Sequence, residues 1–233
     1  MKNTEWGAVT YLAVSQYGKT PEKNSYYVFN GGSDYEEYSA GSETIGEYKT
    51  ATYVVQSTTG NVTGIYDMNG GAWEYVAAYW NNGNGNLNGQ GKSTYFSGNK
   101  LASAYEKYWD KYEVGNDEKT ISSPTEEQAE SMAKDRVNLM TSKKGDAMYE
   151  VINTFSHFYN NTWRIKNASG VYENGYGKTF YNDDFALVGS ASLPFLLRGG
   201  SWWDETTTGV FASNGYYGYW SYNVGFRPVL VAE

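Results

Sequence analysis

Short apolar runs separated by glycine fill the chain beyond residue 185, and they restrict the fold more than any other feature of the sequence. These runs are Phe195-Leu-Leu-Arg198, Gly209-Val-Phe-Ala212 and Val224-Gly-Phe-Arg-Pro-Val-Leu-Val231. Each run has the length of a strand, and the glycines and polar residues between the runs are turn formers. The sequence therefore predicts several short β-strands joined by irregular loops in its C-terminal part.

Helix signals are fewer. Over residues 1–12, Asn3 or Thr4 is expected to cap a helix whose inward face contains Trp6, Val9 and Leu12. Residues 101–112 are a further candidate for a short helix. The polar, glycine-bearing stretch 18–50 is expected to be an ordered loop with short strands, and 80–91 is expected to be a loop from its composition.

The clearest helix is predicted at 124–141. The segment Ser123-Pro124-Thr125-Glu126 has the pattern of a capping box with proline at the first helical position. Its apolar face is expected to consist of Met132, Val137, Leu139 and Met140. Together these patterns predict an α+β fold with short strands, few helices and much irregular loop.

Composition limits the classes of protein to which the chain can belong. Its 233 residues fit a single domain, and a hydrophobic content of 40% is sufficient for a core. There is no cysteine, which excludes disulfides and thiolate zinc sites. The net charge of −8 argues against nucleic-acid binding, because an acidic surface repels phosphates. No apolar run is long enough to span a bilayer, so membrane insertion is not expected.

Catalytic patterns are weak. The only histidine, His157, is expected to be a packed or surface residue. The adjacent acids Asp183-Asp184 and Glu36-Glu37 are expected to lie in wet loops, because paired catalytic carboxylates are rarely neighbours in sequence. The residues themselves therefore indicate a protein that is not an enzyme.

Several segments, taken in order, resemble the formylglycine-generating-enzyme (sulfatase-modifying-factor) branch of the C-type-lectin-like fold. Thr4-Glu5-Trp6 is similar to that family's Thr-Glu-x-Glu-Trp helix. The stretch Gly64-Ile-Tyr-Asp-Met-Asn-Gly-Gly-Ala-Trp-Glu-Tyr75 is similar to its Gly-Leu-Tyr-Asp-Met-x-Gly-Asn-Val-Trp-Glu-Trp signature. Arg198-Gly-Gly-Ser-Trp202 and Gly225-Phe-Arg227 resemble its closing motifs. The resemblance implies one C-type-lectin-like domain over 1–233.

The resemblance does not extend to the family's chemistry. Formylglycine-generating enzymes use a cysteine pair, which this chain lacks, and the related iron-dependent sulfoxide synthases use several histidine ligands, where this chain has one. The β-rich section that precedes the Glu-Trp helix in family members has no counterpart here. A non-enzymatic relative that requires no cofactor is therefore expected.

Other proteins that the chain resembles are binding proteins. They include the variable proteins of diversity-generating retroelements in phages and bacteria, and displayed domains of bacterial surface or pilin-like proteins. In the variable proteins the binding residues lie between the Arg-Gly-Gly and Gly-Phe-Arg motifs, an interval that corresponds to 201–224 here. The resemblance implies an adhesin or receptor-recognition module at a cell or virion surface, with a cell-surface protein or glycan as its partner.

The interval has the composition of a binding face. Residues 216–222 hold five aromatics in seven positions, and residues 209–224 include no charged side chain. Burying so many phenols would require a partner for each hydroxyl, whereas tyrosine with serine, glycine and asparagine is typical of paratopes. Trp202 and Phe211 are expected to belong to the scaffold. The predicted ligand-binding residues are Trp203, Asp204, Asn214, Tyr216, Tyr217, Tyr219, Trp220, Tyr222 and Asn223.

The genetic code bears on the retroelement interpretation. Mutation of adenines in an AAC codon yields Tyr, Ser, Asp, Gly or Thr, and most residues of the interval are of these types or are Asn. Trp203, Glu205 and Trp220 are not reachable from that codon. These three residues are therefore either scaffold or arguments against adenine mutagenesis.

A calcium site is a second candidate. In the enzymes that the chain resembles, an Asp/Asn-x-x-Gly-x-x-x-Glu stretch holds calcium, and Asp67 and Glu74 match its side-chain ligands, with Gly70 and Ala72 as carbonyl donors. The alternatives are that Glu74 forms a salt bridge with Arg198 or Arg227, or that Asp67 caps a turn.

Four residues are expected to be structural, and three whole-protein functions remain open. Arg198 and Arg227 are expected to hydrogen-bond carboxylates or carbonyls beneath the binding loops, with Trp73 and Trp202 in the scaffold. Besides a binding module, the sequence allows a structural or assembly domain of a pilus or virion, or a diverged enzyme.

Overall fold

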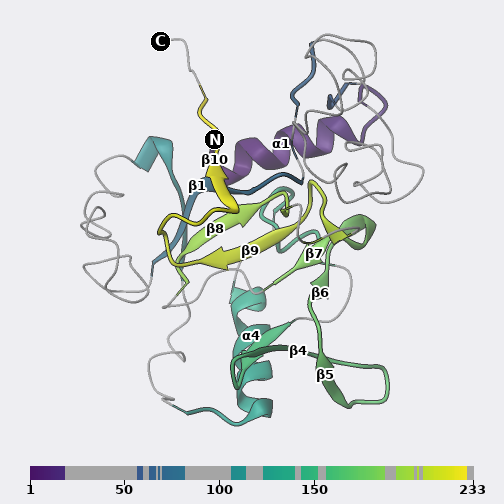
Figure 1. Cartoon of the computed structure of the whole chain (residues 1–233), viewed down its shortest axis with the longest axis vertical. Helices are drawn as coiled ribbons and strands as arrows, with labels where there is room; N and C mark the ends of the chain where they lie inside the picture. The colour runs from purple at the N-terminus through teal and green to yellow at the C-terminus, as the bar shows by residue number, and fades with distance from the viewer. Residues whose placement is uncertain are drawn as a thin grey trace.

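The computed structural model describes residues 1–18, 57–59, 63–66, 68, 70–81, 106–113, 123–139, 143–151, 156–186, 193–201, 204 and 207–229. Over these residues the chain is a mixed α+β structure with two α-helices, short 3₁₀ turns and two β-sheets (Figure 1). The predicted fold class is thus confirmed at this level. The predicted loops at 18–50 and 80–91 lie almost entirely outside the described residues.

A seven-stranded sheet forms the centre of the molecule. Its order is β10-β1-β8-β9-β7-β6, and β2 also pairs with β1. The strands are β1 (Trp73–Asn81), β2 (Asp110–Glu113), β6 (Gly177–Lys178), β7 (Asp184–Phe185), β8 (Phe195–Arg198), β9 (Ser213–Tyr216) and β10 (Val224–Phe226). Because most strands are very short, the sheet is held together mainly by the long strand β1, which pairs with β10, β2 and β8.

The register of β8 and β9 decides where the connecting segments emerge. These strands are antiparallel, with Phe195 opposite Tyr216 and Arg198 opposite Ser213. The connection 199–212 therefore leaves at one end of the pair, and the aromatic segment after Tyr216 leaves at the other. At about 3.3 Å per residue, the two ends lie on the order of 10 Å apart.

Helix α1 (Asn3–Ala13) packs on the sheet through a face that differs from the predicted one. Trp6 is buried, and its indole N–H donates to the Val210 carbonyl at 2.8 Å. Leu12, expected on the same face, is 60% exposed, because the buried face continues through Thr10 and Ala13 instead. The N-cap is Lys2, whose backbone N–H donates to the Glu5 carboxylate at 2.8 Å.

Asn3 and Thr4, predicted as caps, use their side chains elsewhere. The Asn3 amide donates to the Gly145 carbonyl at 3.0 Å, and the Thr4 hydroxyl donates to Asp110 at 2.9 Å. Both bonds tie the start of α1 to distant segments. The prediction of a local cap was therefore wrong, since tertiary partners compete for the same polar atoms.

The main core lies between α1 and the sheet. Its largest buried side chains are Trp6, Met68, Trp80, Phe185 and Phe211. A smaller cluster of Trp73, Leu197 and Ala212 packs on the other side of β1 and β8, so Trp73, which was predicted to be structural, is buried. No helix among the described residues has the length and apolarity needed to cross a membrane.

Helix α4 (Glu126–Leu139) packs on a three-stranded sheet of β3 (His157–Tyr159), β4 (Thr162–Lys166) and β5 (Tyr172–Asn174). Two carboxylates fasten the helix to the sheet: Glu126 pairs with Arg164 at 2.8 Å, and Glu130 pairs with Lys166 at 3.0 Å. Figure 1 shows this unit below the central sheet. The helix was predicted, but the sheet was not.

The capping box of α4 begins two residues later than predicted. The Thr125 hydroxyl accepts the N–H of Gln128 at 3.3 Å, and the Gln128 side chain accepts the N–H of Thr125 at 2.8 Å. Ala129 and Ala133 supply buried apolar positions of the helix, and Met132 is half-buried. The side chains of Val137 and Leu139, and all of Met140, lie outside the described residues.

Two strand and helix predictions need correction. Within 101–112, residues 106–108 form a 3₁₀ turn and Asp110–Glu113 form strand β2, because they pair with the end of β1. The segment 209–212 is a buried turn rather than a strand, with β9 starting at Ser213. Asp183 causes this difference, since its carboxylate accepts the Phe211 N–H at 3.0 Å.

The acids Asp183 and Asp184 are buried, not in a wet loop as predicted. Asp184 forms an ion pair with Lys178 at 2.7 Å and accepts a hydrogen bond from Thr207 at 2.9 Å. Burial raises the pKa of Asp184, and these two donors act against it. His157 is packed, as expected, and lies edge-on to the Tyr172 ring.

Candidate ligand-binding surface

The tyrosine ridge, which we define as residues 216–222, connects β9 towards β10 and carries the most exposed aromatic side chains among the described residues of the interval. Trp220 is 86% exposed and Tyr222 is 83% exposed. Tyr216, Tyr217 and Tyr219 are half-buried. The ridge is therefore not sealed inside the protein.

The half-buried tyrosines support one another. Tyr217 and Tyr219 are stacked, with ring centroids 5.4 Å apart and an interplanar angle of 17°. Tyr216 touches both rings, at 5.5 and 5.3 Å, and packs below them on the core cluster around Trp73. Tyr216 therefore joins the core to the ridge, and its own exposed area is limited.

Tyr75, on the central strand, anchors the ridge from below. Its hydroxyl accepts the Gly218 N–H at 3.1 Å and donates to the Tyr219 carbonyl at 3.0 Å. Gly218 has φ +85°, a left-handed conformation that favours glycine, and a Cβ there would lie 2.2 Å from Cε2 of Phe195. The turn at the top of the ridge is thus fixed by a residue outside the predicted binding interval.

Burial perturbs the pKa values of two of the tyrosines at the base of this surface. Burial raises the pKa of Tyr216, and its hydrogen bond with Tyr219 adds to the rise, whereas Ser221 lowers it. Burial also raises the pKa of Tyr75 well above the ordinary tyrosine value. Since residues 209–224 carry no charge, the surface offers phenol, indole and amide groups to a ligand rather than ions.

The remaining predicted residues are not all part of this surface. Asn223 is half-buried, and its carbonyl accepts the Trp73 N–H at 2.8 Å. Asn214 is also half-buried, two positions before Tyr216 on the same face of β9. Asp204 lies in the 199–212 connection at the opposite end of β9, where its carboxylate accepts the N–H and hydroxyl of Ser201, both at 2.7 Å.

The structure therefore brings together Asn214, the ridge and Asn223, and it separates Asp204 from them. Trp202 and Trp203 lie outside the described residues, so their predicted roles stay predictions. Phe211 is 1% exposed, which confirms it as scaffold.

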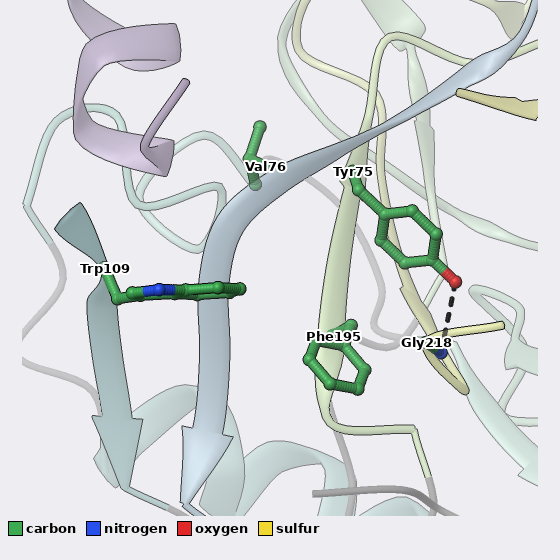
Figure 2. A pocket seen from close by; sticks show the side chains of 5 residues that line it. All are labelled: Tyr75, Val76, Trp109, Phe195 and Gly218. Atoms are coloured by element: carbon green, nitrogen blue, oxygen red, sulfur yellow. Dashed lines mark hydrogen bonds between the residues drawn. The ribbon is translucent and has the colours of Figure 1, made fainter. Parts of the chain in front are cut away.

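A cavity of about 150 Å³ opens beside the ridge and was not predicted from the sequence. Tyr75, Val76, Trp109, Phe195 and Gly218 line it. Figure 2 shows the Tyr75, Trp109 and Phe195 rings around one space, with the hydrogen bond from Gly218 to Tyr75 at its side and Val76 on the strand next to Tyr75. Trp109, which precedes β2, packs edge-on against Tyr79 at 6.1 Å.

Among the candidate calcium ligands, Glu74 forms the salt bridge with an arginine that was the alternative prediction. Glu74 is engaged by Arg227, whose Nε lies 2.9 Å from the carboxylate and whose second nitrogen forms the other half of a bidentate pair. Gly70 is tied to Gly199 by a backbone hydrogen bond of 3.2 Å, and Ala72 is half-buried. Asp67 lies outside the described residues. Within the described part of the chain, no group of three or more acidic or histidine residues is arranged to hold a metal.

The two predicted structural arginines behave differently. Arg227 bonds Glu74 and the Tyr66 carbonyl, at 3.0 Å, as expected for a residue that fastens β10 to β1. Arg198 is completely buried, and none of its guanidinium nitrogens has a hydrogen-bond partner among the described residues, contrary to the prediction. Burial lowers the pKa of Arg198, and the nearby carboxylates Glu150 and Asp183 act against this effect.

A second exposed aromatic cluster lies on the three-stranded sheet, and sequence reasoning missed it. Phe158 and Tyr176 are 49% and 44% exposed, and both touch the Trp163 ring, at 5.2 and 6.0 Å. In the sequence, the dipeptide Asn160-Asn161 between two aromatic runs indicates the turn of this sheet. In the structure both asparagines have positive φ. Two such residues in a tight turn are typical of a β-hairpin.

Comparison of the chain with protein-family models, with curated proteins and with solved structures gives no match. The class of the protein is therefore given by its fold and its surface chemistry: it is an α+β protein with an uncharged aromatic surface on a sheet of short strands.

Proposed function

We propose that the chain is a non-enzymatic binding module of C-type-lectin-like fold, displayed at a cell or virion surface, whose tyrosine ridge recognises a ligand on another surface. The observation that carries the proposal is the exposure of Trp220 and Tyr222 beside the stacked pair Tyr217 and Tyr219. The order of the sequence motifs and the short-stranded α+β architecture support the choice of fold.

Physical chemistry favours recognition as the reason for such a surface. Large aromatic side chains that are exposed to water contribute no hydrophobic free energy until a partner covers them. The stacked pair and the anchored turn restrict these rings before binding, so little conformational entropy is left to lose. Truncation of one central aromatic in such a surface costs about 2 kcal/mol of binding free energy.

The test compares binding of the fluorescently labelled chain to a panel of bacterial cells with that of the double variant Tyr217→Ala/Tyr219→Ala. We expect the variant to retain its unfolding temperature and to bind at least about tenfold more weakly, because both stacked rings are lost. The matched control is Tyr17→Ala/Tyr108→Ala, which removes two exposed tyrosines (77% and 47%) outside the ridge. Equal cell binding by the unaltered chain, the double ridge variant and the control variant would contradict the proposal.

A second candidate function, assembly into a larger structure, is favoured by one observation. Phe226 is 76% exposed on β10, the outermost strand in the described strand order, and an exposed ring at this position beside an aromatic surface suits contact with another subunit. Sedimentation velocity separates the two functions: self-association that is abolished by Phe226→Ser favours assembly, and a monomer at micromolar concentration favours the binding module.

Diversification by a retroelement is a separate part of the proposal. The most exposed ridge residue, Trp220, is not reachable by adenine mutagenesis of an AAC codon, so it would be an invariant contact flanked by variable tyrosines. A reverse-transcriptase gene next to this gene, with a template copy of its 3′ end, is the expected genomic observation. Its absence would remove diversification and leave the binding function untouched.

A further inference from the structure

The cavity beside the ridge has walls that are almost entirely hydrocarbon. The described residues that line it are Tyr75, Val76, Trp109, Phe195 and Gly218, of which Val76 also belongs to the main core. The Tyr75 hydroxyl is already bonded on both sides, to Gly218 and to Tyr219. The only other polar side-chain group of the described lining residues is the Trp109 indole N–H, which is a donor and not an acceptor.

This polarity selects the chemical class of the occupant. A sugar ring carries several hydroxyls, and each hydroxyl placed here without a partner would lose its hydrogen bonds to water. An apolar group loses nothing of this kind and gains from leaving water. The cavity therefore favours hydrocarbon over a glycan.

The volume of the cavity limits the size of the apolar group that it can hold. A cavity of about 150 Å³ lined by apolar side chains accommodates a benzene-sized molecule. A single leucine, methionine or phenylalanine side chain is of comparable volume. A larger drug-like ligand would not fit, since pockets for such ligands are about 300 Å³ or more.

The way the cavity is built connects it to the ridge. The pairing of β1 with β8 shifts register between Tyr75 and Tyr79, and such an irregularity allows the adjacent residues Tyr75 and Val76 to line the same space. Gly218 belongs both to the cavity wall and to the ridge. A partner lying across Tyr217 and Tyr219 therefore reaches the cavity with a neighbouring side chain.

We infer that the cavity receives one apolar side chain, of leucine to phenylalanine size, from a protein partner, so that the ligand of the ridge is a protein rather than a glycan. This inference rests on the proposed binding function. It assigns the cavity the role of the anchor pocket that well-packed interfaces place beside their aromatic contacts.

The experiment uses toluene as a probe of the cavity and the ¹³C-labelled methyl groups of Val76 as the detector. We expect the Val76 methyl resonances to shift upfield or downfield by ring-current effects and to saturate with toluene in the millimolar range. The exposed Val171 is the internal control, because its methyl groups lie outside the cavity and are expected not to move. Methyl β-glucopyranoside at the same concentrations is expected to have no effect on Val76.

A variant pair tests the site directly. Trp109→Ala removes one wall of the cavity and should weaken toluene binding by about tenfold, whereas Tyr108→Ala, at an exposed position that does not line the cavity, should leave it unchanged. The double variant Tyr217→Ala/Tyr219→Ala should still bind toluene, since neither side chain lines the cavity.

Three outcomes would overturn the inference: no saturable shift at Val76, an equal shift at Val171, or a shift of Val76 with the glucoside. Its failure is distinguishable from failure of the proposed function. If the ridge variant loses cell binding but the unaltered chain gives no toluene response, the inference about the cavity is wrong and the proposed binding function stands. A toluene response with unchanged cell binding removes the function.

Discussion

The hydroxyl of Tyr75 and the backbone N–H of Gly218, 143 residues apart in the sequence, are joined by a hydrogen bond of 3.1 Å. The same hydroxyl donates to the Tyr219 carbonyl at 3.0 Å, so one side chain of the central strand holds both sides of the ridge turn. The phenol is half-buried, and its ring also packs edge-on against Phe195 at 6.2 Å. The shape of the candidate binding surface therefore depends on a residue far from it in the chain.

Removal of this hydroxyl should loosen the ridge without unfolding the protein. In Tyr75→Phe the ring contacts are kept, but the Gly218 N–H and the Tyr219 carbonyl lose their partner, which costs about 1–2 kcal/mol of stability. Hydrogen exchange of the Gly218 amide is expected to accelerate about tenfold. Unchanged exchange at Gly218 would show that the turn is held by other contacts.

Glycine at 218 should be required by both conformation and space. Gly218→Ala puts a Cβ in a left-handed backbone conformation and against Phe195, and we expect a loss of about 1–3 kcal/mol in the free energy of unfolding. Gly225→Ala is the matched control, since nothing lies within 4 Å of a Cβ there. Urea denaturation measures both variants. Similar losses in the two would contradict the assigned role of Gly218.

The docking of α4 should weaken in acid. Burial acts to raise the pKa of Glu130, but hydrogen bonds from Lys134, Tyr172 and Lys166 together lower it from 4.5 to about 2. Because the pKa is lower in the folded state, the stabilisation is complete above pH 4.5 and is lost as the pH falls from 4.5 towards 2.

Glu130→Gln should therefore destabilise the protein at pH 7, by on the order of 1 kcal/mol or more, and have little effect near pH 2. Urea unfolding at the two pH values measures the difference, with the exposed neighbour Glu127→Gln as the control. An equal destabilisation at both pH values would mean that the Glu130 carboxylate is not paired in the native protein.

Glu74 should act as the partner of Arg227. Glu74→Gln breaks a bidentate pair between half-buried side chains, and we expect a loss of about 1–3 kcal/mol in the free energy of unfolding, measured by urea denaturation, whereas the exposed Glu173→Gln should change little.

A strong chelator is expected to leave the unfolding temperature of the unaltered chain unchanged. A fall in that temperature, reversed by calcium, would instead support the calcium site predicted from Asp67 and Glu74.

Local patterns predicted some elements well and others poorly, for identifiable reasons. The apolar run of β8 and the helix at α4 were predicted, because their signals are contained in a few adjacent residues. The run 209–212 looks like a strand but forms a turn, since the buried Asp183 carboxylate accepts the Phe211 N–H. That carboxylate was itself expected in water. A residue whose partner is remote cannot be interpreted from its neighbours alone.

The sequence by itself determined the chemistry of the candidate site: an uncharged stretch rich in tyrosine, too polar at its ring tips to be buried as a whole. Only the tertiary structure decided which of those rings face water. The register of β8 and β9 separates Asp204 from the ridge, and Tyr75 and Phe195 set its turn and build the cavity beside it. The physical reason is that composition acts locally, whereas exposure depends on contacts between segments far apart in the chain.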